Sequence, residues 1–180
     1  MLETDPSGGF PAGLKRKAVD DVEQLLEAGE LPPIAAGVVF RCDDGRVLFL
    51  KRAPGEENYA EHWSLPGGRI DGDESPEEAA RREALEETGH EIDGELSPIA
   101  STVTGTGKGK YLTYEHRVEV PFPVRMRDGE HTEHVWARPQ APPMPLHPAV
   151  AELLPELGPI EVGETDSALR LPSRSVPLER

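Results

Sequence analysis

The chain has 180 residues, the length of one compact domain, and can bury about two-thirds of the surface that its unfolded form exposes. Its 34 acidic residues against 19 basic ones give a net charge of -15, and this negative field disfavours binding along DNA or RNA. A lone cysteine, Cys42, excludes an internal disulfide and a cysteine metal cluster. Since no basic and apolar leader and no membrane-spanning apolar run is found, we expect a cytoplasmic protein without membrane contact.

The two ends of the chain differ from its middle. In an N-terminal extension, residues 1–30, helical spacing of Val19, Val22 and Leu26 predicts an amphipathic helix over residues 14–28. This helix either packs on the domain or covers a second subunit in a homodimer. The domain itself is predicted over residues 31–158. Residues 159–180 mix prolines and charges without an apolar period and are predicted to form a C-terminal tail.

The domain begins with a predicted hairpin. Two β-branched or apolar runs, residues 34–41 and 46–52, flank the turn sequence Asp43, Asp44, Gly45.

Shorter apolar runs predict the other strands and a closing helix. The strands are expected over residues 63–65, 97–104, 111–124 and 134–138, and the helix over residues 147–154. Pro121 and Pro123 predict that the strand over residues 111–124 bends or lies at a sheet edge.

The clearest local signals delimit a helix over residues 76–88. Ser75 can cap it, Pro76 suits its first position, and Glu78 completes a capping box. Gly89 marks its end.

This helix carries three carboxylates on one face. Glu83, Glu86 and Glu87 fall within an arc of about 100 degrees, because residues three and four apart are neighbours on a helix. Their mutual repulsion would be relieved by a divalent cation, and oxygen ligands without clustered His or Cys suit Mg²⁺ or Mn²⁺. The alternative is a solvated acidic face, which describes most charge runs.

The spacing around the helix decides between these interpretations. The fixed residues are Gly68, Glu74, Arg82, Glu83, Glu86, Glu87 and Gly89. This pattern resembles the Nudix box in every fixed letter. His90 departs from it, because it stands where the pattern has an aliphatic residue, and we interpret it as a half-buried packing residue.

The resemblance implies an α/β fold, a Nudix-type α/β/α sandwich with a mixed β-sheet. It also implies metal-dependent hydrolysis of a diphosphate linkage in a small nucleoside diphosphate derivative, with Mg²⁺, or Mn²⁺ in its place, as cofactor. By the same resemblance Glu86 and Glu87 bind the metal, Glu83 binds metal or acts as general base, and the Gly68 carbonyl completes the coordination. Arg82 would orient the carboxylates, and Glu74 would support the helix.

Sites outside the box are also expected. The family often supplies a further base or ligand from a later loop, for which Glu130 and Glu133 are candidates, and Glu133 is favoured. Lys51 and Arg52, at the end of the second predicted strand, either contact substrate phosphate or form a solvated strand end.

Two rival functions follow from the same resemblance. One is a non-catalytic Nudix-like domain that binds nucleotides or proteins, but such domains tend to lose box glutamates, and this chain keeps them. The other is an allylic diphosphate isomerase, which would need a protonating group such as Cys42 with a partner. The box predicts the reaction and leaves open which nucleoside diphosphate derivative is cleaved.

Overall fold

The computed structural model describes residues 31–126 and 129–158. The helix predicted over residues 14–28 and the tail predicted over residues 159–180 lie outside the described residues. Within the described ranges, no helix is long and apolar enough to cross a membrane.

One mixed sheet forms the centre of the fold. The elements in chain order are β1 (Pro33–Cys42), β2 (Val47–Arg52), β3 (Trp63–Ser64), β4 (Gly67–Arg69), α2 (Pro76–Thr88), β5 (Ser97–Val103), β6 (Lys110–Val118), β7 (His131–Ala137), α3 (Pro148–Leu153) and the 3₁₀ helix η1 (Leu154–Glu156). The strand order is β3-β2-β1-β6-β5, with β4 beside β1 and β7 beside β2. The β1–β6 pair is parallel and the other pairs are antiparallel, which makes the sheet mixed.

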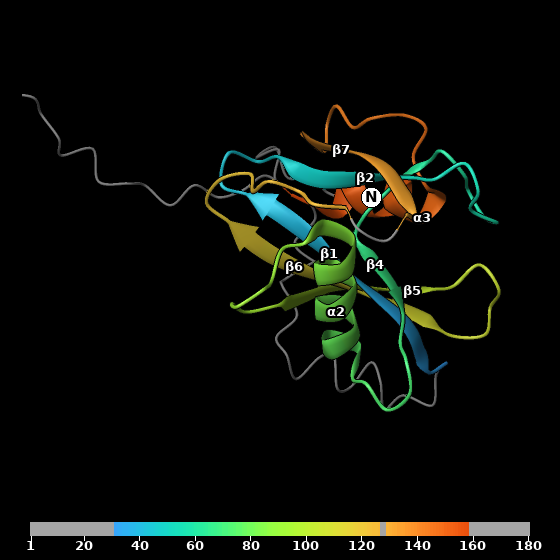
Figure 1. The fold of residues 1–180 in the computed structure, drawn as a ribbon. Helices are drawn as coiled ribbons and strands as arrows, with labels where there is room; N and C mark the ends of the chain where they lie inside the picture. The colour runs from blue at the N-terminus through green and yellow to red at the C-terminus, as the bar shows by residue number, and fades with distance from the viewer. Residues whose placement is uncertain (1–30, 127–128, 159–180) are drawn as a thin grey trace, which may run out of the picture.

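The two helices cover opposite faces of this sheet (Figure 1). Ala79, Ala80 and Ala84 of α2 are fully buried against one apolar cluster, which includes alternate residues of β1 and β2. Val150 and Leu153 of α3 are buried in a second cluster, built on the other residues of the same strands. Successive residues of a strand point to opposite faces, so a nearly continuous apolar run supplies both cores. The predicted α/β/α sandwich is confirmed.

The predicted hairpin is only partly correct. The turn lies where expected, but β1 and β2 are in register at Arg41 and Val47 and then separate. β1 pairs in parallel with β6 along its length and antiparallel with β4 near its start, while β2 pairs with β3 and β7. The buried backbone groups of both strands require partners on each side, and these partners come from distant parts of the chain.

Two strand limits differ from the predictions by more than one residue. β6 ends at Val118, so Pro121 and Pro123 lie beyond the sheet, as expected for residues that cannot donate a ladder hydrogen bond. β7 begins at His131, three residues before the predicted start at residue 134. Its first residues are polar, and they extend the strand because β2 supplies their backbone partners.

Helix α2 is fixed at both ends by local chemistry. Ser75 Oγ accepts from Glu78 N at 3.2 Å, and Ser75 N donates to the Glu78 carboxylate at 2.8 Å, which completes the predicted capping box. Gly89 ends the helix with a φ of 67° and donates to Leu85 O at 2.8 Å. These caps hold the acidic face of α2 at a constant position beside β4.

Candidate active site

The segment of Gly67 and Gly68, which begins β4 and is called the glycine loop below, lies directly against a carboxylate. Gly68 pairs with Ala36 across the sheet, and a side-chain carbon placed on Gly68 would stand 2.5 Å from Glu83 Cδ. Only glycine leaves room for the Glu83 carboxylate there. The structure therefore brings together Gly68 and Glu83, two residues of the predicted metal site.

A tyrosine from β6 packs on the same loop. The hydroxyl of Tyr111 fills the space that a side chain on Gly37 or Gly67 would occupy. Gly67 has a φ of 151°, a conformation that favours glycine. Burial, followed by the charges of Glu87 and Glu83, raises the pKa of Tyr111. The sequence pattern placed Tyr111 in a strand and gave no signal of its approach to this loop.

Arg82 links the carboxylates around it. Its guanidinium donates to both oxygens of Glu74, at 2.7 and 3.1 Å, and to Arg69 O at 2.8 Å. It also donates to Glu83 at 2.9 Å and to Glu86 at 3.4 Å. A fixed planar fork suits this multiple contact. The geometry is that of a group that holds Glu83 and Glu86 in place and ties them to the loop before the helix.

The Glu83 carboxylate lies in an environment that opposes its charge. Burial raises its pKa above the ordinary value, the charges of Glu86 and Glu130 raise it further, and Arg82 acts in the opposite direction. Its side chain is 15% exposed, against 57% for Glu86. Perturbed carboxylates of this kind are typical of catalytic sites and of sites that bind a cation.

Glu87 is the most buried of the three glutamates. Its side chain is 4% exposed, and its Oε2 accepts from Gly67 N at 2.8 Å. Its Oε1 lies 3.8 Å from Nδ1 of His131, which is 2% exposed. The sequence argument missed His131, because it placed this residue in a loop before the last strand.

The donor set fits a hard divalent cation. The carboxylates of Glu83, Glu86 and Glu87 and the backbone of Gly68 could supply oxygen ligands only, the kind that Mg²⁺ and Mn²⁺ prefer. The bare Cα of Gly68 leaves a space that the Glu83 carboxylate fills. Among residues 31–126 and 129–158, however, no three acidic, His or Cys side chains are already gathered around one point. Arg82 and the Gly67 N–H hold the carboxylates instead.

The two candidates from the later loop are placed differently. Glu133 accepts a 2.7 Å hydrogen bond from Lys51 and is 56% exposed. It lies opposite Lys51 in the β2–β7 ladder, on the face that carries Phe49 and α3 rather than α2. The charge of Glu130, in contrast, raises the pKa of Glu83. The structure thus brings Glu130, and not Glu133, towards the acidic face of α2.

The two predicted phosphate contacts are engaged with protein groups. Lys51 is bound to Glu133, as described above. Arg52 forms an ion pair with Glu56 and donates to Asn58 O at 3.0 Å. Each side chain would have to exchange a protein acceptor for a phosphate oxygen.

His90 lies at the end of α2, within an aromatic group. Its ring stacks on Phe122 with centroids 3.7 Å apart and meets Phe40 edge-on at 5.6 Å. Burial, followed by the charge of His116, lowers the pKa of His90. The residue is half-buried and packs, in agreement with the expectation from the sequence.

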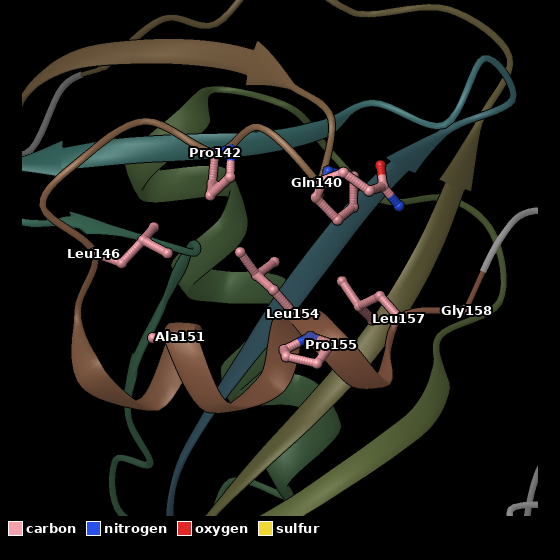
Figure 2. A pocket seen from close by; sticks show the side chains of 9 residues that line it. Gln140, Pro142, Leu146, Ala151, Leu154, Pro155, Leu157 and Gly158 are labelled. Atoms are coloured by element: carbon pink, nitrogen blue, oxygen red, sulfur yellow. The ribbon is translucent and has the colours of Figure 1, made fainter. Parts of the chain in front are cut away.

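A hollow of about 390 Å³ lies on the α3 side of the molecule (Figure 2). Leu146, Leu154 and Leu157 point into it, and Gln140 stands at its edge. None of the described residues that line it carries an ionisable group. This hollow therefore offers no acid or base from the described residues, in contrast to the acidic face of α2.

Comparisons with known proteins identify the family. The family profile of the NUDIX domain matches residues 31–157. The 8-oxo-dGTP diphosphatase of Proteus vulgaris is 37% identical over 80 residues, which cover 44% of this chain and 68% of that protein. The CTP pyrophosphohydrolase of Escherichia coli (strain K12) is 31% identical over 123 residues, 67% of this chain and 87% of that protein.

A solved structure shares the fold. The MutT NUDIX hydrolase from Burkholderia pseudomallei superposes with a TM-score of 0.57 at 24% identity, covering 72% of this chain and 100% of that one. This superposition shows the fold, and the family match over residues 31–157 confirms the resemblance that the box predicted. The chain belongs to the Nudix family and is a hydrolase of diphosphate linkages in nucleotide derivatives.

Proposed function

We propose that the chain hydrolyses the diphosphate linkage of a small nucleoside diphosphate derivative with Mg²⁺, for which Mn²⁺ can substitute. Glu83, Glu86 and Glu87 and the Gly68 carbonyl hold the ion. The observation that carries this proposal is the placement of the Glu83 carboxylate against Gly68, with a raised pKa and with Arg82 on its other side.

Each group of the chain has a distinct task in this reaction. When bound, the ion would supply positive charge for the phosphate oxygens. Glu83 coordinates the ion or accepts a proton from water, and its raised pKa makes it a better proton acceptor than an ordinary carboxylate. Arg82 keeps Glu83 and Glu86 in place and is an organiser rather than a contact of the substrate.

The second proton acceptor or ligand is Glu130 in this proposal, in place of Glu133. The charge of Glu130 raises the pKa of Glu83, whereas Glu133 is paired with Lys51 on the other face of the sheet. Lys51 and Arg52 bind substrate phosphate only when they leave Glu133 and Glu56.

The proposal concerns a small molecule as partner. The net charge of -15 favours a small phosphorylated substrate over a nucleic acid. A homodimer and a cytoplasmic location stay predictions.

The rival binding domain and the rival isomerase are less well supported. A domain that only binds nucleotides or proteins has no need of the box glutamates, and this chain keeps Glu83, Glu86 and Glu87. An isomerase would require a protonating group, and Cys42 is buried at the end of β1 with its Sγ 3.3 Å from Glu119 O.

A substrate panel tests the proposal. Nucleoside triphosphates, nucleotide sugars, dinucleoside polyphosphates and ADP-ribose are incubated with the purified chain and Mg²⁺, and the products are identified. Glu86→Gln and Glu87→Gln serve as controls, and both are expected to reduce turnover. Absence of turnover with every compound would reject the mechanism and favour the binding domain. Equal turnover in both variants and the parent chain would reject the roles of Glu86 and Glu87.

The roles of the two later glutamates are separated by a matched pair of variants. Glu130→Gln and Glu133→Gln remove the same charge from neighbouring positions. We expect Glu130→Gln to lower kcat by about 100-fold, the ordinary contribution of a proton acceptor, and Glu133→Gln to have little effect. The opposite ranking would restore Glu133.

A further inference from the structure

The ladder between β2 and β7 contains an extra residue beside the acidic site. Lys51 faces Glu133, but the next residue of β2, Arg52, faces His131. Thr132 therefore has no opposite residue, which makes this a β-bulge in β7.

The bulge changes the face to which His131 points. In a regular strand, residues 131 and 133 would share a face, because side chains alternate. One extra residue between them places these side chains on opposite faces. Glu133 accordingly meets Lys51 on the α3 side, while His131 reaches Glu87 on the α2 side.

The contact that results is almost closed to solvent. His131 and Glu87 have side chains that are 2% and 4% exposed, and Nδ1 and Oε1 are 3.8 Å apart. This distance is an electrostatic contact rather than a hydrogen bond. The other oxygen of Glu87 accepts from Gly67 N at 2.8 Å. The carboxylate is thus held between the glycine loop on one side and β7 on the other.

The residue before His131, Glu130, continues the backbone pairing with the segment after β2. Ala53 N donates to Glu130 O at 2.6 Å, which continues the backbone pairing past Arg52 and His131. His131, still paired with Arg52, reaches Glu87, and the charge of the preceding residue, Glu130, raises the pKa of Glu83.

We propose that His131 is a positioning residue that holds the Glu87 carboxylate in the orientation required for cation binding. The inference rests on the proposed function, since it assumes that Glu87 is a ligand. Groups that contact ligating carboxylates typically change metal affinity by about 10- to 100-fold when they are removed. A residue that merely fills space would not produce a loss that depends on where its nitrogen lies.

Three substitutions of His131 test the position of the nitrogen. His131→Phe keeps a ring and removes both nitrogens. His131→Asn places an amide nitrogen where Nδ1 stands, and His131→Gln extends it to the place of Nε2. His134→Phe is the matched control, because His134 lies on the same strand and is exposed. The affinity of the full chain for Mn²⁺ alone is measured by titration, with circular dichroism to confirm folding.

We expect His131→Phe to weaken Mn²⁺ binding by about 10- to 100-fold, and His131→Gln to resemble it. His131→Asn should stay within a few-fold of the parent chain, and His134→Phe should match it. If the phenylalanine variant does not fold, the comparison of Asn with Gln decides, and equal affinities in those two variants would overturn the inference.

A reference variant separates this inference from the proposed function. Glu87→Gln must weaken Mn²⁺ binding if Glu87 is a ligand. If the parent chain binds Mn²⁺, Glu87→Gln weakens binding and all His131 variants bind as the parent does, only the role of His131 is refuted. If the parent chain binds no Mn²⁺, the proposed cation site is refuted together with it.

Discussion

A methyl group at Gly68 would displace the carboxylate on which the proposed reaction depends. The side-chain carbon of Gly68→Ala would stand 2.5 Å from Glu83 Cδ. Nonbonded heavy atoms approach to about 3.5 Å, so the Glu83 carboxylate must retreat by about 1 Å. A misplacement of about 1 Å in a reacting group can cost about 100-fold in rate. We therefore expect kcat/KM to fall by about that factor.

The same substitution should leave folding nearly unchanged. The obstructing atoms are the end of a flexible side chain, and Gly68 does not have the positive φ that penalises alanine. Alanine also restricts the unfolded chain, which stabilises proteins by about 0.4 to 1 kcal/mol at compatible positions. The free energy of unfolding should therefore change by less than about 1 kcal/mol.

The assay compares kcat/KM and urea unfolding in Gly68→Ala, the parent chain and the control Gly55→Ala. Gly55 has no atom within 4 Å of its virtual side-chain carbon, so its variant should match the parent in both measurements. Wild-type kcat/KM in a folded Gly68→Ala variant would refute the argument that the position of Glu83 against Gly68 matters. Loss of folding would refute the argument that only a flexible side chain is displaced.

Three further predictions concern stability. Gly37→Ala should destabilise the chain by more than about 2 kcal/mol in urea unfolding. Its side-chain carbon would meet the Tyr111 hydroxyl and the backbone carbonyl of Pro66, which stands at 2.5 Å and cannot retreat. Normal stability would contradict this. Ser75→Ala should cost about 1 kcal/mol through loss of the hydrogen bond to Glu78 N, and an unchanged urea midpoint would show that the cap contributes nothing. Burial raises the pKa of Tyr114 from 10.0 to about 12, so the folded chain keeps a proton that the unfolded chain releases. Stability should therefore fall between about pH 10 and 12, by up to about 1.4 kcal/mol per pH unit, and Tyr114→Phe should remove that contribution in unfolding measured at both ends of this range.

The helix and the glycine loop of the site could be predicted because their signals are local. Ser75 and Gly89 delimit α2 through contacts within a few residues, and the structure has both caps as predicted. The approach of Glu83 to Gly68 follows from the same segment, since loop and helix are separated by a short connection. Chain neighbours thus determine most of the acidic site.

Strand pairing could not be predicted from the same kind of signal. The runs of β1 and β2 flank a turn, so a regular hairpin was expected, yet β1 takes β6 as its long partner. An apolar run indicates burial on both faces and does not specify which distant strand supplies the neighbour. The contact of Tyr111 with Gly37 and Gly67 depends on that pairing, and therefore it had no signal in the sequence.

The choice between Glu130 and Glu133 depends on one residue of register. Both are glutamates near the start of β7, and composition gives no reason to separate them. The bulge at Thr132 separates the two ends of this segment. Glu133, after the bulge, pairs with Lys51, while His131, before it, points towards Glu87. A register shift of one residue reverses every side chain beyond it, so the position of the bulge decides which groups of this segment can take part in the reaction.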